Sequence, residues 1–369
     1  MPESLSKMPG GMRYHFGDEA RLRRAVEAGA LGVFDGWGYE EIATPAVDYY
    51  ALFERGMGRE EAGRAFRFTD TDGRMLALRA DLTSSVARAA ATLFAAAPRP
   101  LRFCYAASVF RQRPRSHAEW KRQGRQVGCE LIGAGGAGAD LEVLAVAAEV
   151  LERLGLRGRC CFTVNHVGVF NGLAEELRLD PEARERVRRL VDARDAAGLE
   201  ELLARRAGGE TPALAGRLTR LSGKREALTA ARSLVSNGRT AEALAALAQV
   251  WDAVEALGLA DAFEVDLGDV SGLDYYTGLI FKIYVEGAGA RVGGGGRYDE
   301  LTASFGRREP AVGFVLDTDA ITEVLARAGV DLAGGNGRHF QSVGGESLSE
   351  RLLEAQRRRA RGERVRLAL

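Results

Sequence analysis

The segment with the clearest chemical potential is Gly272–Gly278, which reads Gly-Leu-Asp-Tyr-Tyr-Thr-Gly. Asp274 offers a carboxylate, and Tyr275 and Tyr276 offer two phenols. The flanking glycines permit close backbone approach and unusual dihedral angles, so the segment suits a small polar ligand. The alternative is a strand and turn whose tyrosines are core residues, because tyrosines usually pack.

A glycine run follows closely, at Gly293–Gly296, and Arg297, Tyr298 and Asp299 come directly after it. Consecutive glycines cost backbone entropy and supply no side chain to a core. We therefore expect a glycine turn with something lying against its backbone. Two such segments so near each other favour a ligand pocket over simple packing.

Composition excludes several classes of function. The chain has 369 residues, of which 46% are hydrophobic, and its 51 basic and 51 acidic side chains give a formal net charge of zero. This is enough apolar material for a large core, but no long-range field attracts a polyanion. We expect no nucleic acid as an obligatory partner.

Cysteine and histidine patterns give no sign of a metal site. The four cysteines lack C-x-x-C spacing, and the four histidines are scattered, so we expect no metal and no cofactor. No run approaches the ~20 apolar residues of a membrane helix, and the first residues do not resemble a secretory leader. We expect a cytoplasmic protein with reduced thiols and no membrane partner.

The elements that must position these residues follow from periodicity and turn signals. We expect helices over 19–34, from Asp81 or Thr83 to about Ala97, over 140–154 with Asp140 as N-cap, and over 319–328. Strands are expected over 101–111, 125–132, 160–167, 263–267, 278–286 and 311–316, with a hairpin over 64–79 that turns at Asp72-Gly73.

The chain divides into a core, an insertion and a tail. Residues 181–257 are nearly all helix formers between strand-like segments, so they form a helical insertion into one sheet within a core of residues 1–330. A glycine-rich linker covers 331–346. The tail, 347–369, opens with a capping-box pattern. We expect a helix there whose Leu348, Leu352 and Leu353 point inward, followed by a short terminal strand.

Several segments together resemble histidyl-tRNA synthetases, a class II aminoacyl-tRNA synthetase family. Those segments are Gly272–Gly278, Gly294–Asp299, Pro310–Phe314, Leu78–Thr83, Phe110–Pro114 and Gln126–Glu130, the last two looking like class II motif 2. Ordered segments are far more specific than a lone glycine motif. The resemblance covers about residues 8–328. It implies an α+β fold, in which helices flank an antiparallel six-stranded sheet with a helical insertion and a short C-terminal α/β tail, and a homodimer.

The resemblance also implies a histidine pocket. Asp81, Thr83 and Gln126 would hold the α-ammonium group, Glu130 and Tyr276 would address the imidazole, and Tyr275 and Tyr298 would close the pocket. Carboxylates and neutral acceptors stabilise an ammonium group, and a second carboxylate selects an imidazole N–H. The alternative is that Gln126 and Glu130 are ordinary strand residues.

Two departures from the family pattern argue against catalysis. Ser271 stands where the synthetases carry an arginine that contacts the carboxylate and the developing adenylate, and Ala320 replaces the arginine that grips ATP phosphates. Loss of one preorganised group at a charged transition state costs ~10²- to 10³-fold in rate. Arg111 persists as a remnant, an ion-pair partner or an anion contact. The loop 113–125, with His117 and Trp120, is either a solvated loop or a nucleic-acid-like contact.

A synthetase-like core with these losses resembles the regulatory subunits of ATP phosphoribosyltransferase. Too few residues follow Val330 for the anticodon-binding domain of the synthetases. The resemblance implies a non-catalytic subunit that forms a hetero-oligomer with a short-form catalytic subunit and lets histidine inhibit the first step of histidine biosynthesis. The alternatives are a divergent histidyl-tRNA synthetase, or a stand-alone histidine sensor that binds another protein. Helices 181–257 and the loop 113–125 are candidate contact surfaces.

Overall fold

The computed structural model describes residues 7–113, 121–204, 211–235, 237–270, 276–330, 332, 340–344 and 347–368. The chain forms two compact units, Met1–Gly329 and Val330–Leu369, called here the large unit and the small unit. Several predictions fall on residues outside the described ranges. They concern Ser271, Asp274, Tyr275, His117, Trp120 and most of the predicted linker.

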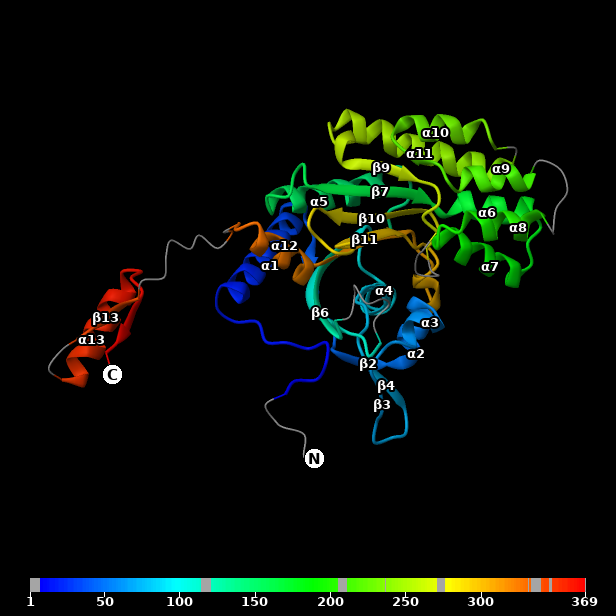
Figure 1. The fold of residues 1–369 in the computed structure, drawn as a ribbon. Coiled ribbons are helices and arrows are strands. Elements are labelled where there is room, and N and C mark those ends of the chain that lie inside the picture. Colours follow the sequence, from blue (N-terminus) through cyan, green and yellow to red (C-terminus); the bar gives the residue numbers. More distant parts are fainter. Residues whose placement is uncertain are drawn as a thin grey trace. The chain divides into compact units, whose positions relative to one another are not determined.

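A mixed sheet forms the centre of the large unit (Figure 1). Its nine strands among the described residues follow the order β1-β5-β6-β12-β11-β10-β7-β9-β8. In that order they span Glu40–Glu41, Leu101–Phe110, Gln123–Ile132, Ala311–Asp317, Gly293–Arg297, Leu279–Val285, Cys160–His166, Phe263–Asp266 and Ser222–Gly223. Every neighbouring pair from β5 to β7 is antiparallel, whereas β1 lies parallel to β5 and β9 parallel to β7. The six-stranded antiparallel sheet is thus the middle of a larger one.

Helices cover both faces of this sheet. On one face lie α1 (Gly17–Gly36), α5 (Ala137–Arg153) and α12 (Thr318–Arg327), where Phe34 of α1 meets Phe314 of β12 edge-on with ring centroids 5.9 Å apart. The shorter helix α4 (Thr83–Ala91) lies inside the curve of the opposite face (Figure 1). There Leu82 and Val86 pack with Phe103 and Tyr105 of β5. The sheet therefore separates a packed face from a face that α4 only partly covers.

The predicted hairpin is confirmed as part of a small second sheet in the large unit. Its strand order is β2-β4-β3, spanning Val47–Tyr49, Met75–Leu78 and Arg67–Thr69. Gly73 takes a φ of 77° in the predicted Asp-Gly turn, which glycine adopts without strain. Helices α2 (Tyr50–Met57) and α3 (Arg59–Ala62) connect this sheet. The Arg88 guanidinium donates to Asp48 Oδ1 at 2.8 Å, which ties α4 to β2.

The helical insertion is also confirmed. It follows α6 (Val167–Glu176) and contains α7 (Pro181–Asp192), α8 (Ala196–Ala204), α9 (Thr211–Leu218), α10 (Arg225–Arg232) and α11 (Gly238–Ala256). Two 3₁₀ turns, Ala260–Ala262 and Thr302–Phe305, complete the large unit. Strands β7 and β9 flank the insertion and pair directly, so it enters and leaves one sheet at adjacent positions.

The small unit combines one helix with two short parallel strands. Strand β13 (Gln341–Val343) pairs with β14 (Val365–Leu367), and α13 (Leu348–Ala360) connects them. The capping box is confirmed, because Ser347 and Glu350 exchange both hydrogen bonds. The inward orientation of the leucines is wrong: Leu348, Leu352 and Leu353 are 54%, 40% and 53% exposed, and the buried residue of the helix is Ala355.

Three local predictions for the large unit are wrong, each for a tertiary reason. The glycine run is the central strand β11 rather than a turn, because β10 and β12 satisfy its backbone on both sides. Helix α4 ends at Ala91, and the chain turns before Ala97. Asp140 lies inside the first turn of α5, because it pairs with Arg297 at 2.7 Å instead of capping the helix. Among the described helices, none is long and apolar enough to cross a membrane.

Candidate functional site

A cavity of about 670 Å³ opens on the α4 side of the central sheet. It brings together most of the residues predicted to bind histidine. Those that line it are Asp81, Thr83, Gln126, Glu130, Tyr276 and Tyr298. Arg111 and Ala320 line the same cavity. The remaining candidates, Tyr275 and Ser271, lie outside the described residues.

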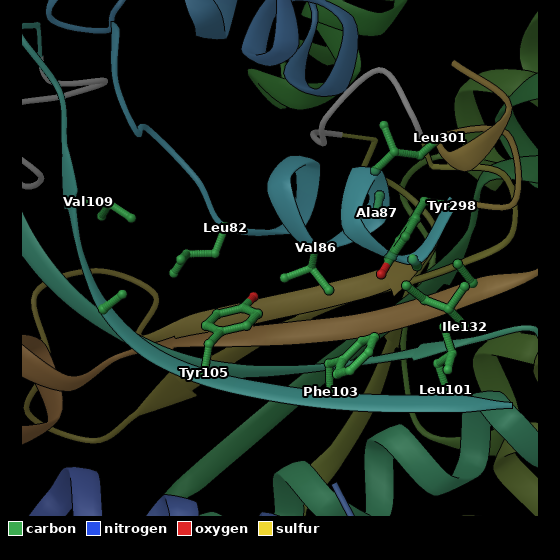
Figure 2. Packing of buried hydrophobic residues seen from close by; sticks show 13 residues of the cluster. Leu82, Val86, Ala87, Leu101, Phe103, Tyr105, Val109, Ile132, Tyr298 and Leu301 are labelled. Atoms are coloured by element: carbon green, nitrogen blue, oxygen red, sulfur yellow. The ribbon is translucent and has the colours of Figure 1, made fainter. Parts of the chain in front are cut away.

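Strand register explains how the sheet positions these side chains. Gln126 and Glu130 are four residues apart on β6, so the two-residue period of a strand places them on one face. Tyr105 on β5 lies opposite Gly128, between them on the same face. Thr83 begins α4 above this face. Figure 2 shows Tyr105 rising from β5 toward α4, below Leu82 and Val86.

Two glycines make room for the polar groups of the cavity. Gly313 on β12 pairs with Glu130, and a Cβ at Gly313 would overlap the Glu130 carboxylate. A Cβ at Gly128 would lie 2.8 Å from the Tyr105 hydroxyl oxygen. A Cβ at either position would also lie within 2.5 Å of a backbone carbonyl oxygen, so both glycines serve the strand packing as well as the site.

Glu130 is the most constrained group of the cavity, with only 1% of its surface exposed. Thr83 Oγ1 donates to Glu130 Oε1 at 2.7 Å, and the Tyr105 hydroxyl donates to the same oxygen at 2.9 Å. The Tyr298 hydroxyl donates to Oε2. Three donors on one buried carboxylate fix its orientation and satisfy part of its acceptor capacity.

Burial and hydrogen bonding act on Glu130 in opposite directions. Burial raises the pKa of its carboxyl to about 7, while the hydroxyls of Tyr298, Thr83 and Tyr105 lower it and the charge of Asp81 raises it. The desolvation cost therefore exceeds what the three hydroxyls return. A ligand N–H that bonded to this carboxylate would favour its ionised form.

Asp81 is the second carboxylate of the cavity. Its oxygens accept hydrogen bonds from the Ser84 amide at 3.3 Å and from Ser84 Oγ at 3.1 Å. Burial raises the pKa of Asp81 to about 6, and the two Ser84 bonds and the charge of Arg111 lower it. The Arg111 guanidinium itself donates to Ala80 O at 3.1 Å, so part of its donor capacity holds the backbone next to Asp81.

The glycines of strand β11 are needed for a structural reason that the sequence alone does not show. A Cβ at Gly293, Gly294 or Gly296 would lie 2.5, 2.7 or 2.5 Å from a carbonyl oxygen of a neighbouring strand. The Tyr276 ring also lies against Gly296. What approaches this backbone is thus partly the protein itself, although Gly293, Gly294 and Gly295 also line the cavity.

The outer part of the cavity is rich in ion pairs. Lys121 Nζ lies 2.8 Å from Glu323 Oε1, Arg13 lies 3.0 Å from the same oxygen, and Arg23 Nε lies 2.6 Å from Asp319. Ala320 lies in the first turn of α12, where its amide donates to Asp317 Oδ1 at 2.9 Å. Its methyl group offers no charge to a phosphate.

Tyr105, Lys282 and Asp269 are among the cavity-lining residues that the sequence analysis does not identify. The sequence predicts Tyr105 only as a strand residue, although its two-residue spacing from Phe103 and Ala107 places the three on one face. Lys282 is the one charged residue of β10, a signal that the sequence carries plainly. Asp269 could not be paired with Lys282 without the fold.

The polar groups of the cavity suit a small, polar, positively charged or zwitterionic ligand. The carboxylates of Asp81 and Glu130, the Gln126 carboxamide and the hydroxyls of Thr83, Tyr105 and Tyr298 all line it. Among the described residues, no group of three or more His, Cys, Asp or Glu side chains is arranged to hold a metal ion. The chemistry of the site is therefore hydrogen bonding and charge pairing.

The curved antiparallel sheet, the helical insertion between β7 and β9, and this cavity define a class II aminoacyl-tRNA synthetase core. The family model for histidyl-tRNA synthetase matches residues 11–321. The chain is 37% identical over 363 residues to an ATP phosphoribosyltransferase regulatory subunit of Moorella thermoacetica, covering 97% of this chain and 91% of the relative. It is 40% identical over 324 residues to one of Symbiobacterium thermophilum, covering 87% and 80%.

Solved structures agree with these relatives. An ATP phosphoribosyltransferase regulatory subunit/histidyl-tRNA synthetase of Bacillus halodurans superimposes with a TM-score of 0.88 at 29% identity, covering 100% of this chain and 94% of that one. A histidyl-tRNA synthetase of Nostoc shares the fold at a TM-score of 0.79 and 20% identity. The chain belongs to the histidyl-tRNA synthetase family, and within it to the ATP phosphoribosyltransferase regulatory subunits.

Proposed function

We propose that this protein is a non-catalytic subunit that binds histidine in the cavity and regulates a separate, short-form ATP phosphoribosyltransferase in the first step of histidine biosynthesis. The names of the relatives support the regulatory role and the catalytic partner. The single observation that carries the ligand is Glu130, a buried carboxylate in a polar cavity whose three hydroxyl donors leave it acceptor capacity. Histidine is the effector of the proposed feedback inhibition.

Glu130 is suited to the imidazole. A carboxylate accepts from an imidazole N–H, and it accepts more strongly when the imidazole is charged. The Tyr276 ring, which lies against Gly296, offers an aromatic wall on the same side of the cavity. A ligand with no N–H at this place would leave the buried Glu130 carboxylate with an unsatisfied acceptor, which costs about 1–3 kcal/mol.

Asp81 and Gln126 are suited to the α-ammonium group. Asp81 keeps acceptor capacity beyond its two bonds from Ser84, and the Gln126 side-chain oxygen is a neutral acceptor on the same cavity wall. Thr83 donates its hydroxyl proton to Glu130, so its oxygen lone pairs stay available to accept from an ammonium group. The same threonine would thereby link the two ends of the ligand.

The absence of catalysis is part of the proposal. Adenylate formation develops negative charge that a class II enzyme stabilises with cations. Ala320 supplies none at the start of α12, and Ser271 supplies none from its segment. The cations Lys121, Arg13 and Arg23 are already paired with carboxylates. Binding energy would then serve regulation, through a histidine affinity that differs between quaternary states.

A homodimer is proposed from an exposed apolar face. The small sheet of the large unit exposes Val47, Tyr49 and Phe68 by 40%, 44% and 42%. Tyr49 and Phe68 both pair with Leu76 of the central strand β4, so they share one face. A second copy of the chain would remove this apolar face from water, which favours association.

Calorimetric titration of histidine tests the proposed function. The wild-type protein should release heat on binding, alone or with the catalytic subunit, and Glu130→Gln should weaken binding about 10- to 100-fold by removing a charged acceptor of the same shape. The matched control is Glu142→Gln, because Glu142 pairs with Arg102 at 2.8 Å outside the cavity. No association in any of these preparations overturns the assignment, and robust histidine-dependent ATP–pyrophosphate exchange by the wild type overturns its non-catalytic part.

A further inference from the structure

One ion pair in the cavity wall belongs to none of the proposed contacts with the imidazole or the ammonium group. Lys282 Nζ on β10 lies 2.6 Å from Asp269 Oδ1, and both residues line the cavity. Their side chains are 18% and 4% exposed. Burying two charges carries a desolvation penalty that their mutual attraction often only balances. Apolar residues would close this wall at least as well, so the pair is better explained by a ligand charge than by stability.

Asp269 is held in place from behind. Its carbonyl oxygen accepts from Asn165 Nδ2 at 2.8 Å, and Asn165 on β7 is only 2% exposed. The Asn165 side chain in turn accepts from the His166 amide at 2.8 Å, which locks its amide orientation. Because the Asp269 backbone is anchored in this way, its carboxylate holds the Lys282 ammonium group at the cavity wall.

Register places Lys282 on the same face as Glu130. Lys282 lies opposite Gly294, and Gly294 lies opposite Val315, two residues from the Gly313 that faces Glu130. The face between the cation and Glu130 therefore carries Gly294 and Gly313, which have no side chains, together with Val315. Three strand spacings separate the two backbones, about 14 Å. Both residues line the same cavity, which extends across these strands.

The charges of a zwitterionic ligand require a cation at this end. Glu130 and Asp81 can receive an imidazole and an ammonium group, but neither can receive a carboxylate. Ser271 brings no charge. The lysine ammonium has three N–H donors, and among the residues that the structure describes Asp269 is its one ion-pair partner.

Four other cations of the cavity have different partners. Lys121 and Arg13 share Glu323, and Arg23 pairs with Asp319. The Arg122 guanidinium stacks 4.6 Å from the centre of the Phe66 ring, next to the hairpin. Lys282 differs from these four because its strand pairing places it on the sheet face that also carries Glu130.

We propose that Lys282, oriented by Asp269, binds the α-carboxylate of the amino acid in the cavity, in place of a cation at position 271. This inference rests on the proposed function, because it assumes that an amino acid occupies the cavity. It makes Lys282 a determinant of specificity for ligands that carry a carboxylate. Asp269 acts through the lysine and is a positioning residue.

A comparison of two ligands tests the inference. Histidine and histamine differ only in the carboxylate, so the ratio of their dissociation constants measures what that group contributes. In the wild type, histidine should bind about 10- to 100-fold more tightly than histamine, as expected for one charge-assisted contact. Lys282→Met should weaken histidine binding by that factor and leave histamine binding unchanged. The ratio of the two dissociation constants should then be close to one. Lys282→Arg should keep most of the discrimination.

Two further variants keep the test decisive. Lys282→Met leaves Asp269 buried without its partner, so the double variant Lys282→Met/Asp269→Asn, checked by thermal melting, should lose discrimination in the same way without the buried charge. Lys121→Met, which removes a cation of the same cavity, should keep the wild-type ratio. If the wild type binds histidine but Lys282→Met preserves its ratio, the inference is overturned and the proposed function stands. If the wild type binds neither ligand, the proposed function itself fails.

Discussion

The Glu130→Gln variant should gain stability relative to the wild type as pH rises. The quantity compared is the difference between their unfolding free energies, measured without ligand. Burial raises the pKa of Glu130 from its ordinary value of 4.5 to about 7. Between these two values the folded protein holds a proton that the unfolded chain has released. The unfolding free energy of the wild type therefore falls as pH rises through this window and stays level above it.

The size of the effect follows from the same shift. At about 1.4 kcal/mol for each pH unit, the rise in pKa corresponds to about 3 kcal/mol across the window. Glutamine does not titrate, so the stability difference between Glu130→Gln and the wild type should move by about 3 kcal/mol in favour of the variant between pH 4.5 and pH 8. Asp81, whose pKa is raised to about 6 by burial, titrates in both proteins and largely cancels.

Denaturant unfolding at a series of pH values measures this difference, with the fluorescence of the buried Trp251 as one signal. Glu142→Gln is an informative control because its sign is opposite. A hydrogen bond from Arg102 lowers the pKa of Glu142, so that glutamate stabilises the fold above its unfolded pKa and loses the contribution as pH falls through its folded pKa. A difference for Glu130→Gln that stays flat with pH, or one that turns against the variant as pH rises, would refute the argument.

Four further outcomes are expected. Gly313→Ala should abolish histidine binding measured by calorimetry while the protein still folds by circular dichroism, because its Cβ would overlap the Glu130 carboxylate; retained affinity would contradict this geometry. Tyr298→Phe removes one hydrogen-bond donor to the Glu130 carboxylate and should weaken histidine binding about 10-fold. An unchanged dissociation constant would show that the Tyr298 hydroxyl does not contribute to binding. Phe68→Glu should shift the protein toward monomer in sedimentation velocity, because it places a charge on the exposed apolar face; an unaltered dimer would locate the interface elsewhere. Ser271→Arg should leave histidine-dependent ATP–pyrophosphate exchange undetectable, since Ala320 still offers no charge, and measurable exchange would show that one cation suffices.

Much of the fold was predictable because it is encoded locally. Helix α1 repeats its buried residues with helical spacing, at Leu22, Val26, Ala30 and Val33. The Asp-Gly turn of the hairpin and the Ser347 capping box carry their own turn chemistry. These signals involve residues a few positions apart, so a single sequence suffices to identify them.

Features that depend on distant partners were not predictable. Asp140 has the chemistry of an N-cap, but Arg297, far along the chain, takes its carboxylate. Four glycines indicate a turn until two neighbouring strands are known to enclose them. The leucines of α13 follow a helical stripe, yet the small unit buries Ala355 instead. In each case local chemistry allowed two outcomes, and tertiary contacts chose between them.

The candidate site shows the same division. The four-residue spacing of Gln126 and Glu130 predicts one strand face, and both residues line the cavity. The contribution of Tyr105 to Glu130 required knowledge that β5 pairs with β6 in a register that leaves Gly128 beneath the ring. Lys282 was visible as a charge in an apolar strand, but its distance from Glu130 depends on the strand order.

Energetics connect this cavity to regulation. Ionised Glu130 costs the ligand-free fold about 3 kcal/mol by the shift above, and a ligand at one hundred times its dissociation constant returns about 2.7 kcal/mol to the state that binds it. These are comparable quantities, so occupancy of the cavity can offset the strain of burying its carboxylate. Coupling between sites is typically about 1–3 kcal/mol. A subunit whose binding site carries a free-energy cost of that size can shift a quaternary equilibrium when histidine arrives, provided that the cavity differs between the two states.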